Sequence, residues 1–204
     1  MPGYFIMGVV YAFAAAVQPG PFQAYLISQS LSHGWRRTIL ASFAPLISDG
    51  PIILLVLLIL STVPPWLLLA LQCAGGVFLF YLAYGAFRTW RTYATRTEPA
   101  AESGQRSVLQ AALVNFLNPN PYLGWSLVMG PLLVKGWREA PALGISLLVG
   151  FYATMILCTA AIIMFFSAAR NLGLKIRRTL IGVSAIALAC FGIYQLWLAA
   201  LARW

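Results

Sequence analysis

One acidic residue, Asp49, lies inside a long apolar run of the sequence. The run begins near Thr38, and at about 1.5 Å per helical residue Asp49 lies roughly 17 Å further on, near the middle of a bilayer. A carboxylate at that depth costs a few kcal/mol unless it is paired, hydrated or protonated. We therefore expect Asp49 to trade a proton for a cationic group of a substrate. The alternative is a structural role, in which a protonated or hydrogen-bonded Asp49 holds helices together.

Two proline-rich motifs interrupt other apolar runs: Gln18-Pro19-Gly20-Pro21 and Asn118-Pro119-Asn120-Pro121. Proline lacks an amide hydrogen and clashes with the carbonyl four residues back, so each motif should break or sharply bend a helix. Lipid cannot satisfy the freed backbone groups, so such breaks persist where they line an enclosed cavity. The half-helices that follow should direct unpaired amides and positive dipole ends at a carboxylate. Alternatively, the prolines only kink helices for packing.

Polar side chains near the breaks add hydrogen-bond donors and acceptors to the predicted site. Gln72 and Tyr84 could line the same cavity, although bonding to a neighbouring helix is an equal alternative. The predicted substrate-binding residues are Gln18, Pro19, Gly20, Pro21, Asp49, Gln72, Tyr84, Asn115, Asn118, Pro119, Asn120 and Pro121. Asp49 is also the predicted proton-coupling residue.

Motifs of enzymes and of metal or cofactor sites are missing from the sequence. It contains no Gly-rich phosphate loop, no His/Cys set with metal-ligand spacing and no nucleophile–base pair. Cys73, Cys158 and Cys190 lie singly in apolar runs, which favours small buried side chains over redox or metal chemistry. We therefore expect no enzymatic activity, no cofactor and no metal.

The composition predicts a polytopic membrane protein. The chain has 204 residues, of which 61% are hydrophobic and only 8% charged. A helical span needs roughly 20 apolar residues, so six spans and short connections account for nearly the whole chain. The predicted all-α fold has spans at about residues 4–28, 38–60, 66–87, 108–134, 142–168 and a last one ending near 201.

The basic residues indicate how the chain is oriented. Of the 13 Lys and Arg, 10 fall in the first, third and fifth connections, which should therefore be cytoplasmic and leave both termini outside. We therefore attribute the formal charge of +9 to basic residues that set the membrane orientation, and we expect no nucleic-acid partner.

The second half of the chain echoes the first. Pro119 lies 100 residues after Pro19, and Gly136-Trp137-Arg138 repeats Gly34-Trp35-Arg36. Residues 81–87 and 191–197 also resemble each other. We expect a three-helix repeat at 1–87, a cytoplasmic linker at 88–107 and a second repeat at 108–204. Three spans is an odd number, so the second repeat must be inverted in the membrane, with the first and fourth helices broken.

The pattern resembles the LysE family of amino-acid translocators. The match consists of Pro19-Gly20-Pro21, Gly34, Asp49, the run from Gly75 through Phe78-Leu79 to Arg88, and Asn118-Pro119. The resemblance implies a small multi-pass protein of the bacterial inner membrane that exports amino acids or similar metabolites. It further implies that a proton gradient drives export and that Pro19-Gly20-Pro21, Asp49 and Asn118-Pro119 lie at the transport site. Family members often carry lysine where this chain has Asn120, so the substrate's charge stays open.

Two other functions remain as alternatives. An exporter of metal or inorganic ions could share the architecture, although one acidic residue and no histidine in a span make a poor cation site. A non-transporting membrane factor, for lipid handling or assembly, would have a cavity open to lipid or none. The expected partners are a small-molecule substrate and the bilayer, and small-residue helix faces permit a homodimer.

Overall fold

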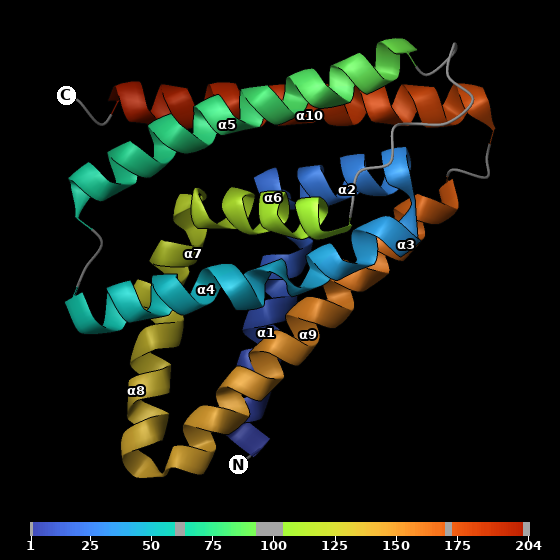
Figure 1. Cartoon of the computed structure of the whole chain (residues 1–204). Coiled ribbons are helices and arrows are strands. Elements are labelled where there is room, and N and C mark those ends of the chain that lie inside the picture. Colours follow the sequence, from blue (N-terminus) through green and yellow to red (C-terminus); the bar gives the residue numbers. More distant parts are fainter. Residues whose placement is uncertain (1, 60–63, 93–103, 170–172, 202–204) are drawn as a thin grey trace.

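The computed structural model describes residues 2–59, 64–92, 104–169 and 173–201, and every element within these ranges is a helix (Figure 1). In chain order the elements are α1 (Pro2–Val17), α2 (Pro21–His33), α3 (Trp35–Thr38), η1 (Ile39–Phe43), α4 (Ala44–Leu54), η2 (Leu55–Ile59), α5 (Pro65–Thr92), α6 (Gly104–Phe116), α7 (Pro119–Gly124), η3 (Trp125–Met129), α8 (Gly130–Glu139), α9 (Pro141–Ala168) and α10 (Leu174–Leu201). The segment η1 is a 3-10 helix, and η2 and η3 are π-helical. The all-helical prediction is confirmed for these residues.

Four helical stretches in the described part are long and apolar enough to cross a bilayer. They are Trp35–Leu57, Pro65–Arg91, Pro141–Ala168 and Leu174–Leu201, and the bent pair α1–α2 makes a fifth if it is counted as one span. The predicted fourth span, about residues 108–134, is divided between α6 and the run from α7 to α8. Within it, Ser107–Phe116 is apolar but shorter than a membrane span. The chain is therefore a multi-pass membrane protein.

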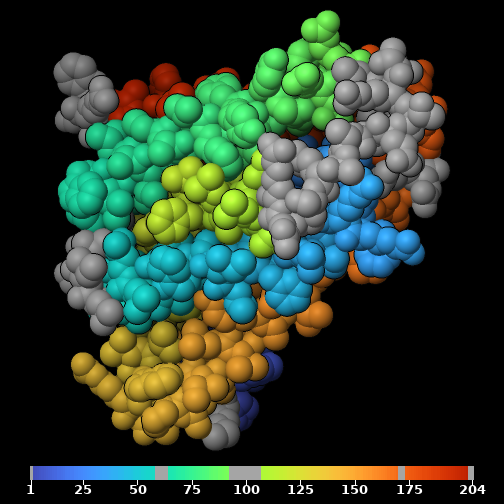
Figure 2. Space-filling model, viewed as in Figure 1, coloured from blue at the N-terminus to red at the C-terminus, as the bar shows by residue number. Residues whose placement is uncertain are grey.

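Long helix pairs form the two sides of the molecule. The helix α5 lies antiparallel to α10 on one side, and α1 packs along α9 on the other (Figure 1). Between these pairs, α2 contacts α6, α9 and α10, and α4 packs against α6. In the face shown in Figure 2, α4 runs across the middle of the surface, with α5 on one side of it and α8 and α9 on the other.

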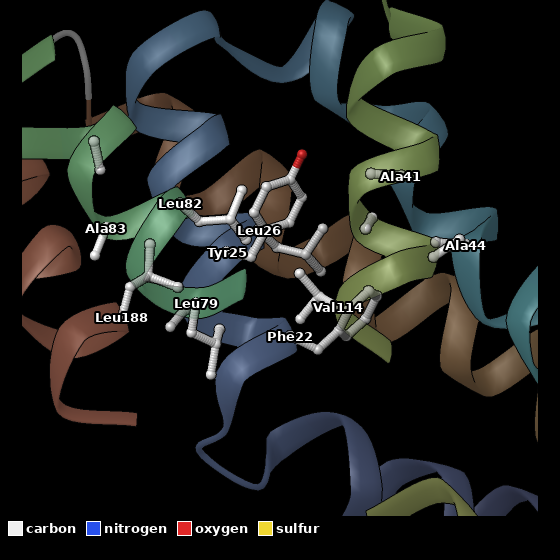
Figure 3. Packing of buried hydrophobic residues seen from close by; sticks show 14 of the residues in the cluster. Phe22, Tyr25, Leu26, Ala41, Ala44, Leu79, Leu82, Ala83, Val114 and Leu188 are labelled. Carbon is white, nitrogen blue, oxygen red and sulfur yellow. The ribbon is translucent and has the colours of Figure 1, made fainter. Parts of the chain in front are cut away.

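The centre of the molecule is filled around α2. Phe22, Tyr25 and Leu26 of α2 pack with buried side chains from η1, α4, α5, α6 and α10 (Figure 3). The Tyr25 hydroxyl lies 3.0 Å from Gln110 Oε1 and 3.2 Å from the Ser107 carbonyl oxygen, which ties α2 to α6. This packing fixes the half-helix that follows the first proline motif.

Glycines let α1 and α9 touch backbone to backbone. A Cβ added at Gly8 of α1 would overlap the Leu147 carbonyl oxygen, and one added at Gly150 of α9 would overlap the Phe5 carbonyl oxygen. Small residues that allow close approach are typical of helix contacts in membranes. The position of α1, which leads into the first break, is therefore set by its contact with α9.

Some predicted boundaries shift in the structure. The predicted connection at 29–37 is mostly helical, because α2 runs to His33 and α3 starts after Gly34, whose φ of 83° makes the turn. The predicted turn after residue 134 is also wrong, because α8 continues to Glu139. The glycines of the repeated Gly-Trp-Arg motif thus differ, since Gly136 lies inside α8 while Gly34 separates two helices. Most of the predicted linker at 88–107 falls on residues 93–103, which lie outside the described residues.

Candidate functional site

The first break separates α1 from α2, which meet at an angle of 65°. The helix α1 ends at Val17, and Pro21 occupies the first turn of α2, a position where the missing amide hydrogen is tolerated. The last carbonyls of a helix have no partner within it. Here the Gln23 side-chain amide donates to the carbonyl oxygens of Ala15 and Ala16, at 3.2 and 3.1 Å. The bend is therefore stabilised from inside the protein.

The second break separates α6 from α7. Asn118 caps α7, and its Oδ1 accepts a hydrogen bond of 3.1 Å from the Asn120 backbone amide. Pro119 follows the cap at the first helical position. Both interruptions therefore occur at the two proline motifs, as their local chemistry predicts.

Asp49 lies on α4, between the breaks, and is only 3% exposed. Asn115 of α6 donates from Nδ2 to Asp49 Oδ1 at 2.9 Å and to Ser48 Oγ at 2.8 Å. The side chain of Trp125 in η3 also makes a hydrogen bond to the Asp49 carboxylate. The carboxylate thus faces polar groups of two neighbouring helical segments and not the acyl chains.

A cavity of about 120 Å³ joins Asp49 to both breaks. One water occupies about 30 Å³ of liquid, so the space exceeds that of a single water. Its polar wall consists of residues from the proline motifs together with Gln23, Asp49 and Asn115. Its apolar and aromatic wall includes Tyr11, Trp125, Phe151 and Met155. A mostly apolar pocket with a few convergent polar groups is typical of a small-molecule site.

Most of the predicted site residues line this cavity, and four do not. Those that line it are Gln18, Pro19, Gly20, Asp49, Asn115, Asn118, Asn120 and Pro121. Pro21 and Pro119 are buried at the starts of α2 and α7, directly behind the lining. Gln72 and Tyr84 lie on α5 outside the lining, and Tyr84 is 65% exposed.

The structure also adds residues that the sequence reasoning did not identify. Trp125 follows Pro121 by one helical turn, and Gln23 follows Pro21 by two residues, so closeness to the breaks was an available signal. Tyr11 lies against Gly124, where an added Cβ would overlap its hydroxyl. Phe151 and Met155, on α9, gave no such signal, because only the packing of α9 against α1 brings them to the cavity.

The charge in the cavity determines what it can bind. Among the described residues of the lining, Asp49 is the only one with an ionisable acidic or basic side chain, and it accepts a hydrogen bond from the Asn115 side-chain amide. Among the described residues, no group of three His, Cys, Asp or Glu side chains could hold a metal ion. The cavity can therefore accommodate a small polar solute with a cationic group directed at Asp49.

Comparison with known proteins assigns the chain to a family. Searches of curated proteins and of solved structures each give no significant match. A family model described as LysE type translocator matches residues 13–198, which is nearly the whole chain. With its membrane-spanning helices, the protein therefore belongs to the LysE type translocator family of membrane transporters.

Proposed function

We propose that this protein exports amino acids or related small metabolites across the bacterial inner membrane by secondary active transport driven by a proton gradient. The observation that carries the proposal is the single cavity bounded by both helix breaks and by Asp49. Helices interrupted in corresponding halves of a chain are typical of substrate sites in secondary transporters. Family membership supports export of amino acids or related compounds.

In the proposed complex the substrate is a zwitterion. Its ammonium group faces Asp49, the one anion in the lining. Its carboxylate faces the start of α2, where Gly20, Phe22 and Gln23 line the cavity. The first amides of a helix have no partner within it, and the positive end of the helix dipole favours an anion there.

Proton coupling follows from competition at Asp49. The carboxylate can hold either a proton or the substrate ammonium group, because both neutralise the same buried charge. Protonation from outside would release the substrate and reset the carrier. Asn115 and Trp125, which bond to the carboxylate, would keep it in place while it is empty.

Alternating access is proposed to involve two inverted three-helix repeats. In such a pair of repeats the first helix corresponds to the fourth, and the second to the fifth. If the first half of the first helix packs on the fifth helix, then the first half of the fourth helix should pack on the second. Consistent with this, α6 packs on η1 and α4, and α1 packs on α9. The third and sixth helices, α5 and α10, pair with each other. The basic residues of the odd connections would be cytoplasmic, with both termini outside.

The test is counterflow of a panel of labelled amino acids in reconstituted vesicles. Gln18→Ala removes a side chain from the lining, while Gln72→Ala removes the same side chain from α5, outside the lining. We expect Gln18→Ala to raise the KM for the transported amino acid several-fold and Gln72→Ala to leave it unchanged. No counterflow of any amino acid by the unaltered protein would refute the proposal.

A further inference from the structure

A second hollow, of about 540 Å³, adjoins the central cavity. It is a groove between η2 of the second helix and the run from η3 to α8. Its walls include Leu57 from η2 and Ser126 from η3. Small-molecule sites in proteins commonly have volumes of about 300–1,000 Å³, so the groove is large enough for an amino acid.

The groove has a positive charge. Lys135 and Arg138 both line it, and they are three residues apart on α8, which places them on one face of the helix. Among the described residues of the lining, Glu139 is the one acidic residue. Two cations against one carboxylate leave the lining with a net positive charge, so the groove favours an anionic group.

Trp125 lies between the groove and the central cavity. It lines both hollows, is only 2% exposed and bonds to Asp49. Gly130 lies against the Trp125 backbone, since an added Cβ would overlap the Trp125 carbonyl oxygen and would lie 3.0 Å from the Leu57 side chain. Trp125 and Leu57 belong to π-helical segments, and such segments are frequent at functional sites. The indole is therefore placed to separate the two spaces.

We propose that the groove is a second substrate site, which binds the carboxylate of an amino acid between Lys135 and Arg138, and that Trp125 separates this site from the central cavity. The inference rests on the proposed export function, because it takes the same substrate class. Guanidinium and ammonium groups form strong charge-assisted hydrogen bonds with carboxylates. The basic residues of the groove lie on the side that the charge distribution places outside, so the site would be used as substrate leaves.

The test uses a cysteine reporter in the groove. Ser126→Cys is introduced into a chain whose Cys73, Cys158 and Cys190 are replaced by alanine, and its alkylation by a membrane-impermeant maleimide is timed. We expect an equimolar mixture of the standard amino acids to slow alkylation several-fold, and the corresponding amino-acid amides, which lack the carboxylate, to have no effect. The combined change Lys135→Gln and Arg138→Gln should abolish this protection.

Lys175→Gln is the matched control, because Lys175 is an exposed lysine outside the groove lining. It should leave the protection unchanged. In counterflow, Lys135→Gln with Arg138→Gln should raise the KM about tenfold for substrate offered on the side from which Ser126→Cys is labelled, and not on the other side. Thermal unfolding would verify that the variants fold.

Failure of this inference and failure of the proposed function give different results. If the unaltered protein transports amino acids but the amides protect equally, or protection survives the loss of both cations, the groove site is refuted and the export function stands. If no amino acid is transported but the carboxylate-dependent protection is observed, the groove binds carboxylates and the export function is refuted.

Discussion

Replacing Asp49 with asparagine tests the proton-coupling proposal most directly. The change removes the ionisable group and keeps the shape of the side chain. The asparagine Oδ1 can still accept the hydrogen bond that Asn115 now donates to Asp49 Oδ1 at 2.9 Å. A neutral amide is also cheaper to bury than a carboxylate. We therefore expect Asp49→Asn to fold with unchanged or higher thermal stability and to lose proton coupling.

The size of the effect follows from the cavity. Among the described residues, the lining contains a single acidic side chain, so each transport cycle should move one proton through it. One pH unit corresponds to about 1.4 kcal/mol per proton. A difference of one pH unit should thus support at most about a tenfold gradient of a zwitterionic amino acid, which has no net charge. With Asp49→Asn the gradient should disappear, while exchange of labelled for unlabelled substrate continues with a higher KM, because the substrate ammonium group loses its charged partner.

The assay measures accumulation of a transported amino acid in vesicles after an imposed pH step, with the membrane potential clamped by valinomycin and potassium. Glu139→Gln is the control for proton coupling alone, because Glu139 is acidic and lies outside the central cavity; it lines the groove, so the quantity compared is the accumulation limit and not the KM. It should keep the tenfold limit. Accumulation well above tenfold per pH unit would show that a second group carries protons. Undiminished accumulation by Asp49→Asn would remove Asp49 from the proton path.

Three further changes have expectations set by the structure. Gly8→Ala should lower the free energy of unfolding, measured by chemical denaturation, by about 1–3 kcal/mol, because the added Cβ would overlap the backbone of α9. Gly3→Ala is the control and should leave the free energy of unfolding unchanged, because nothing lies within 4 Å of the added Cβ. Asn115→Ala should lower the free energy of unfolding by about 1–3 kcal/mol, because it removes a hydrogen-bond donor from the buried Asp49. If the same change lowers the free energy of unfolding less in an Asp49→Asn background, the Asn115–Asp49 hydrogen bond is confirmed. Trp125→Ala should speed the labelling of an Asn120→Cys reporter by an impermeant reagent applied on the groove side, because Trp125 lines both the groove and the central cavity. An unchanged labelling rate would show that Trp125 does not separate the two spaces.

The sequence predicts the features of the site that depend on local chemistry. Proline removes an amide hydrogen wherever it occurs, so both breaks can be placed from Pro19, Pro21, Pro119 and Pro121 alone. The depth of Asp49 follows equally from counting residues along an apolar run. Helix content needs only composition, and the cytoplasmic side stays a prediction from the positions of the basic residues.

Tertiary packing determines which side chains meet at the cavity. Asn115 reaches Asp49 because α6 packs on α4, and Trp125 reaches it because η3 continues the helix from the second break. Gln72 and Tyr84 were equally plausible from their types, but α5 holds both outside the lining. Phe151 lines the cavity only because Gly8 and Gly150 let α9 lie against α1.

The amino-acid sequence by itself thus determined where the helices break and that one acid is buried between them. The tertiary structure decided which partners surround that acid, and it alone revealed the basic groove behind Trp125. The physical reason is the range of the interactions. A missing amide hydrogen acts within one helical turn, whereas the face that a helix presents to its neighbours depends on how several helices pack at once.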